Sequence, residues 1–135
     1  MTGTNVGVTL TWLTAVVFIA TAAIHLSGFP EIQALARETG GDVADLMPPL
    51  WLFFSIDLVI LGTVAGVMAR TPTATHGVIL CLLGLVPAAA AVLQIGYIGF
   101  IPPTAILFFD TLVAIAAGLA MRRIALPRQR DEGRR

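Results

Sequence analysis

Four long apolar runs constrain this chain more than any other feature. They cover about residues 8–29, 50–69, 78–98 and 103–121, each close to the roughly 20 residues that a helix needs to cross a bilayer. Backbone N–H and C=O groups in lipid must be hydrogen-bonded within the segment, which favours helices. The sequence therefore predicts one all-α domain over residues 1–135, an integral membrane four-helix bundle.

The composition agrees with a membrane location and excludes several other classes. Only 12% of the 135 residues are charged, against about 25% in soluble domains. The basic tail 122–135 is short and also carries Asp131 and Glu132, so nucleic acid is not an expected partner. The single cysteine, Cys81, excludes an internal disulfide and a Cys-based metal or redox motif. No cofactor is expected.

The arginine distribution predicts the orientation of the spans. Arg70 and the tail that begins with Arg122 lie on one side, and the acidic connection 30–49 lies on the other. The positive-inside rule then places both termini in the cytoplasm of a multi-pass protein of the bacterial inner (plasma) membrane. Within the external connection, residues 30–41 are typical of a short amphipathic helix on the membrane surface. Pro87 predicts a kink in the third span.

One polar side chain interrupts each apolar run: His25, Asp57, Gln94 and Asp110. A carboxylate in mid-bilayer costs about 2.5 to 3.5 kcal/mol, so two of them require an explanation. Counting a rise of 1.5 Å per residue from the outer end of each span places all four roughly 6 to 11 Å below the outer surface. We therefore expect one polar layer in the outer half of the bundle.

The helical faces indicate which sides pack. At 100° per residue, a stripe of the first span is expected to face the interior; it comprises Thr11, Thr14, Phe18, Thr21 and His25. Small residues beside Asp110, including Ala114 and Gly118, would let a neighbouring helix approach closely. Gly62 and Gly66 lie on the opposite side of their helix from Asp57. They form a face for another helix or for a homodimer.

The polar set admits three interpretations. The first is a periplasm-facing pocket lined by the four buried residues and Thr21, with Tyr97, Ser55 and Trp51 at its mouth. Two close carboxylates do not both ionise readily, so Asp57 and Asp110 would act as acid and base, with His25 as proton relay and Gln94 orienting the ligand. The second is a structural network in which Gln94 caps a carbonyl freed by Pro87. The third is a proton or ion path. A metal site is not expected, because no HxxxH or ExxH spacing is present.

The sequence resembles the DoxX-like group of small four-helix bacterial membrane proteins. The resemblance covers the first half of the chain and rests on residues 22–25 (AAIH), Phe29 and Pro30, the pair Pro48 and Pro49, and the acidic Asp57. The chain differs in having Asp where Glu is usual and in its longer acidic first loop. The resemblance implies the four-helix topology and an association with membrane redox or quinone chemistry. The architecture and the buried acids are also similar to the sterol isomerase and sigma-2 receptor fold.

These observations favour a membrane protein that binds a small, mainly apolar molecule such as a quinone, an isoprenoid or a sterol-like compound. If it is an enzyme, isomerisation or hydration by acid–base chemistry fits best. The alternatives are a small proton-coupled transporter or channel and an accessory subunit without chemistry of its own. Membrane lipid is the expected surrounding partner.

Overall fold

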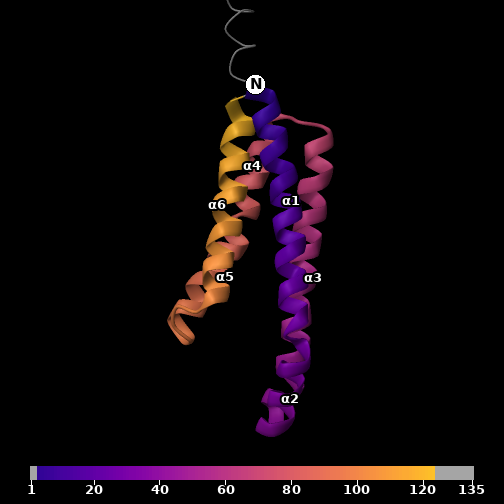
Figure 1. The fold of residues 1–135 in the computed structure, drawn as a ribbon, viewed down its shortest axis with the longest axis vertical. Coiled ribbons are helices and arrows are strands. Elements are labelled where there is room, and N and C mark those ends of the chain that lie inside the picture. The colour runs from indigo at the N-terminus through magenta and orange to yellow at the C-terminus, as the bar shows by residue number, and fades with distance from the viewer. Residues whose placement is uncertain (1–2, 124–135) are drawn as a thin grey trace, which may run out of the picture.

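The computed structural model describes residues 3–123 and is helical, with no strand in that range. Figure 1 shows its six helices, which are α1 (Gly3–Ser27), α2 (Phe29–Thr39), α3 (Gly41–Arg70), α4 (Ala74–Leu83), α5 (Leu85–Tyr97) and α6 (Pro102–Arg123). In this range, four helical stretches are long and apolar enough to cross a membrane: Asn5–Ser27, Ala44–Arg70, Ala74–Tyr97 and Pro102–Arg123. The all-α prediction is confirmed. Residues 124–135 of the predicted basic tail lie outside the described residues.

The helices form a bundle that is packed at one end and open at the other. α1 packs against α3 on one side and against α6 on the other, and α6 also packs against α4 and α5. α3 and α6 make almost no direct contact, because α1 lies between them. The result is two arms, α1 with α3 and α4–α6 together, which diverge toward the end that carries α2 (Figure 1).

Small residues hold the closed end together. Its buried core comprises Ala15, Ala65, Met68, Leu80, Ala117 and Met121. A Cβ atom added to Gly118 of α6 would lie 2.6 Å from the carbonyl oxygen of Gly77 and 2.5 Å from Cys81 Sγ on α4. The predicted close approach beside Asp110 is therefore confirmed, with α4 as the neighbouring helix.

The face carrying Gly62 and Gly66 is occupied within the chain. A Cβ atom at Gly62 would lie 2.9 Å from the carbonyl oxygen of Ala15 on α1, and one at Gly66 would contact the Trp12 ring at 3.6 Å. The expectation that this face could join two copies is corrected, since α1 already covers it. Of the two uses that small residues serve, packing within the chain is the one seen here.

Proline positions explain two further differences from the predicted helix limits. α3 begins at Gly41 rather than near residue 50 and runs through Pro48 and Pro49. These prolines remove only two ladder bonds, near the polar end of the helix where water can replace them. In the third span the helix is interrupted at Gly84. The ring of Pro87 would clash with the carbonyl four residues earlier, that of Leu83, so the predicted kink begins where α4 ends.

A helix also forms in the acidic connection. α2 runs from Phe29 to Thr39 and packs against α3. Gly40 and Gly41 stop it with φ angles of 70° and 61°, a left-handed conformation that glycine adopts without a Cβ penalty.

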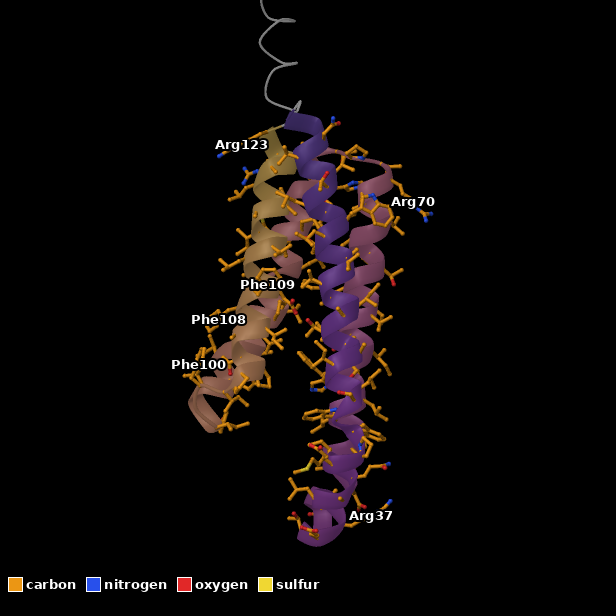
Figure 2. All side chains as sticks on the ribbon, viewed as in Figure 1. Arg37, Arg70, Phe100, Phe108, Phe109 and Arg123 are labelled. Atoms are coloured by element: carbon orange, nitrogen blue, oxygen red, sulfur yellow. The ribbon has the colours of Figure 1, made fainter. Side chains whose placement is uncertain are left out.

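The outer surface of the bundle suits lipid. Large apolar side chains are exposed on all six helices, including Val16 at 61%, Phe53 at 63% and Leu112 at 66%. Figure 2 shows Arg70 and Arg123 at the closed end and Arg37 at the opposite end, beyond the apolar surface. Such a continuous apolar surface between charged ends is what the hydrocarbon of a bilayer requires.

The close contact of α4 with α6 leads to a stability prediction. Gly118→Ala should lower the free energy of unfolding by about 1 to 3 kcal/mol, because the added methyl group overlaps the Gly77 backbone. Thermal unfolding in detergent, followed by circular dichroism, measures the change. Gly96→Ala is the matched control, since a Cβ there meets no atom within 4 Å. Equal loss in both variants would contradict the packing.

Candidate functional site

A cleft of about 370 Å³ lies where the two arms diverge. α1, α2 and α3 form one wall, and α5, α6 and the turn between them form the other. Most of the lining is apolar and comprises Ile24, Gly28, Trp51, Phe54, Ile98, Ile101, Pro103, Ile106 and Leu107. The polar lining residues are Thr21, His25, Ser27, Glu31 and Gln94. A mainly apolar cavity with a few polar groups is the usual form of a small-molecule site.

His25 is the most firmly held polar side chain in the cleft. Its Nδ1 atom lies 2.8 Å from Ser55 Oγ, and its ring stacks on Trp51 with centroids 3.8 Å apart and planes at 14°. Trp51 also donates its indole N–H to the backbone carbonyl of His25 at 2.8 Å, and Phe54 meets the imidazole edge-on with centroids 5.0 Å apart. α3 therefore fixes the orientation of this imidazole before any ligand arrives.

Behind the cleft, Thr21 connects the lining to a buried acid. The Thr21 hydroxyl donates to Asp110 Oδ1 at 3.2 Å, across the contact of α1 with α6. Asp110 is 0% exposed, and its Oδ2 atom has no hydrogen-bond partner among the described residues. The predicted burial of Asp110 and the inward-facing stripe of α1 are both confirmed, since Thr11, Thr14 and Phe18 are likewise 0% exposed.

On the opposite wall, Gln94 is held by the turn that leads into α6. The backbone N–H of Ile101 donates to Thr104 Oγ1 at 3.3 Å, and the Thr104 hydroxyl donates to Gln94 Oε1 at 2.9 Å. The amide is thus anchored to α6. The expectation that Gln94 caps a carbonyl freed by Pro87 is wrong, because that carbonyl belongs to Leu83, eleven positions earlier in the sequence.

A second, apolar groove of about 440 Å³ borders the same aromatic cluster. Leu46, Met47 and Leu50 of α3 line it together with His25, Trp51 and Phe54. His25, Trp51 and Phe54 therefore form the boundary between this shallow groove and the cleft. Apart from His25 and Trp51, the groove has no polar lining residue among the described residues, whereas the cleft has several.

The polar residues lie at two levels rather than in one layer. α1 and α3 run antiparallel, with Trp51 beside His25 and Gly62 beside Phe18, so Asp57 is level with Thr21. Thr21 contacts Asp110 and fixes its level too. His25 stands four residues, or about 6 Å, farther out along α1. The single-layer expectation failed because the outer ends of the helices are not level.

The two carboxylates do not form the expected pair. Asp110 Oδ1 is bonded to Thr21 and Oδ2 has no partner, so no hydrogen bond joins Asp110 to Asp57. α1 separates the helices that carry them. Asp57 is half-buried and does not line the cleft. A proton shared between these two acids is therefore not a feature of this structure.

Four of the other predicted site residues belong to the site, and Tyr97 does not. Ser55 and Trp51 hold His25, and Thr21 and Gln94 line the cleft. Tyr97 is 87% exposed and lines neither the cleft nor the groove, because it lies at the end of α5 and faces outward.

Sequence reasoning missed Phe54, Glu31 and Thr104. Phe54 follows Trp51 by three positions, which places both on one face of α3, so the helical period carried that signal. Glu31 lines the cleft from α2, and Thr104 acts only through Gln94; neither is marked by a sequence pattern. Among residues 3–123, no three His, Cys, Asp or Glu side chains gather closely enough to hold a metal ion.

Comparison with protein families, with curated proteins and with solved structures finds no match for this chain. The DoxX-like assignment remains a prediction from the sequence.

The contact of Thr21 with Asp110 is open to a double-mutant cycle. Thr21→Val and Asp110→Leu should be coupled by about 1 kcal/mol in the free energy of unfolding, because each alone leaves the other partner buried without its hydrogen bond. Thermal unfolding of both single variants and the double variant gives the coupling.

The matched control pairs Asp110→Leu with Thr14→Val. The Thr14 hydroxyl bonds to the Leu10 carbonyl of its own helix, so the two changes should add within about 0.5 kcal/mol. Coupling of the same size in both cycles would show that the Thr21 hydroxyl has no specific bond to Asp110.

Proposed function

We propose that the chain is an inner-membrane protein that binds one small, mainly apolar molecule in the cleft between its two arms. The observation that carries this proposal is the cleft itself: apolar walls from both arms enclose His25, Thr21 and Gln94. The volume of about 370 Å³ falls at the lower end of the range of small-molecule sites. Quinones, isoprenoids and sterol-like compounds remain the candidate ligands.

We assign any acid–base chemistry in this cleft to His25 rather than to Glu31, the other titratable lining residue, which is exposed on α2. His25 is the one imidazole in the lining, and three residues of α3 fix its orientation. Asp110 would act indirectly, by orienting the Thr21 hydroxyl. An isomerisation or a hydration remains the reaction class that we propose if the protein is an enzyme.

The packing at the closed end favours a binding pocket over a transport path. A transporter must open its inner end at some stage, and here that end is filled by a core that joins the two arms, with Ala15 and Ala65 on one side and Leu80 and Ala117 on the other. The core around Met68 and Met121 fills the space between the arms at the same level. The cleft therefore has one open end.

We place the open end of the cleft on the periplasmic side, with both termini in the cytoplasm. Arg70 and Arg123 lie together at the closed end (Figure 2), and positive charge favours the cytoplasmic face. In a Cys81→Ala background, Glu38→Cys should react with a membrane-impermeant maleimide in intact cells, whereas Thr71→Cys should react only after permeabilisation. The reverse pattern would refute this orientation.

Ligand binding is measured with a tryptophan of the cleft as reporter. Trp12→Phe leaves Trp51 as the single indole. The fluorescence of Trp51 should change saturably when purified protein in detergent is titrated with decylubiquinone, farnesol or cholesterol, and the ligand that binds should raise the melting temperature.

The matched variants fill either the cleft or the lipid-facing side of the same helix. Ile106→Phe should weaken binding roughly tenfold, because its ring occupies the cleft. Leu112→Phe, at a position 66% exposed on α6, should bind as the parent does. If all three ligands leave both fluorescence and melting temperature unchanged, the proposed function is wrong.

A further inference from the structure

We propose that the cleft selects a ligand whose polar end is an uncharged hydroxyl group, in preference to a carbonyl, carboxylate or ammonium group. This inference rests on the proposed binding function and adds the chemical class of the ligand. It follows from the directions of the hydrogen bonds around three lining residues.

The first of these is His25, whose tautomer is assigned by its neighbours. The Ser55 hydroxyl donates its single hydrogen to the backbone carbonyl of Trp51 at 3.1 Å. Ser55 Oγ also lies 2.8 Å from His25 Nδ1, and both contacts are hydrogen bonds only if Nδ1 donates, so we assign the hydrogen of the neutral ring to Nδ1. His25 Nε2 is left with a free lone pair and has no partner among the described residues. Because His25 lines the cleft, we assign this acceptor to the cleft.

Thr21 is also an acceptor toward the cleft. Its one hydroxyl hydrogen goes to Asp110 Oδ1, so only lone pairs remain for a ligand. Asp110, which is fully buried, is thereby a positioning residue that fixes the direction of this hydroxyl. Glu31, which lines the cleft from α2, adds a carboxylate.

Gln94 supplies the one donor that is fixed in direction. The Thr104 hydroxyl accepts from the Ile101 N–H and donates its own hydrogen to Gln94 Oε1. The amide oxygen is occupied, and the NH₂ group is left for a ligand. Gln94 lines the same cleft as His25 and Thr21.

Of the hydroxyl, carbonyl, carboxylate and ammonium groups, only the hydroxyl matches this set, because it both donates and accepts. Its hydrogen can go to His25 Nε2 or Thr21 Oγ1 while its oxygen accepts from the Gln94 amide. A carbonyl has no hydrogen for the acceptors, and an ammonium group has no lone pair for Gln94. A carboxylate would in addition face Glu31 across an apolar cleft. Sites built to bond a hydroxyl reject analogues that lack it, since their own buried groups are then left unpaired.

The test uses five probes with the same isoprenoid chain: farnesol, farnesal, farnesylamine, farnesoic acid and the hydrocarbon farnesene. The fluorescence of Trp51 in the Trp12→Phe protein gives each dissociation constant. Farnesol should bind about tenfold more tightly than farnesal and farnesene, the loss expected when buried partners stay unpaired. Farnesylamine and farnesoic acid should bind more weakly than farnesol.

Two variants test the assignment of His25. In His25→Phe, which keeps an aromatic ring against Trp51, the ratio of farnesol to farnesene affinity should fall toward one. Ser55→Ala keeps the imidazole but removes the acceptor of Nδ1–H, so the same ratio should fall even if His25→Phe does not fold. Thr63→Ala is the control, because Thr63 is exposed and bonds only to the Val59 carbonyl of its own helix; its ratio should equal that of the parent.

The outcomes separate this inference from the proposed function. If farnesene and farnesal bind as tightly as farnesol, the cleft binds apolar molecules and the hydroxyl selectivity is wrong. Tighter binding of farnesylamine would likewise overturn it in favour of a cationic ligand. A preference for farnesol that persists in both His25→Phe and Ser55→Ala refutes the role of the tautomer. If no probe binds, the proposed function fails as well.

Discussion

The close approach of helix backbones at the closed end is the contact on which the rest of the structure depends. α4 and α6 meet at Gly77 and Gly118 with no room for a methyl group, and α1 meets α3 at Gly62. Apolar side chains provide no net driving force between helices in lipid, so dense packing of small residues has to supply the stability. The buried core that joins the two arms, with Ala15 and Ala65 on one side and Leu80 and Ala117 on the other, lies at the same end. The opposite ends of the arms can therefore diverge without loss of the bundle.

The divergence turns costly polar residues into a usable site. If the arms were parallel, packed side chains would fill the space between His25 and Gln94 and leave no room for a ligand. Here each is anchored to its own arm, His25 by Ser55 and Gln94 by Thr104. Each keeps one hydrogen-bonding group free on the cleft side. The structural network and the binding pocket therefore use the same residues. The hydrogen bonds that hold the His25 and Gln94 side chains in place also orient their free groups toward a ligand.

Much of the fold could be predicted from the sequence, because hydropathy and helix length act locally. The four spans, the break near Pro87 and the burial of Asp110 and Thr11 all follow from composition and from the 3.6-residue period. The level of each polar residue along the bundle could not be predicted as well. Residues were counted from presumed span ends, but α3 starts well before Leu50, and the level of a residue is set by contacts between helices rather than by its own helix.

Residues that act together in the site could be predicted only where they lie on one face of the same helix. Trp51 and Ser55 share a face of α3, and their association with the polar set was expected. The bond from Thr21 to Asp110 and the chain from Ile101 through Thr104 to Gln94 depend on how helices meet. The pairing of Asp57 with Asp110 failed for the same reason, since no sequence pattern shows that α1 lies between them.

The early start of α3 makes the two walls of the cleft unequal in height. With 30 residues, α3 is about 45 Å long, whereas the 22 residues of α6 span about 33 Å, close to the hydrocarbon thickness. One wall therefore extends farther than the other at the open end of the cleft (Figure 1). An apolar molecule would reach the cleft by lateral diffusion in the surrounding lipid, over the shorter wall. Its apparent affinity would then scale with its partition into the bilayer, so the lipid-to-protein ratio becomes a variable of every binding measurement.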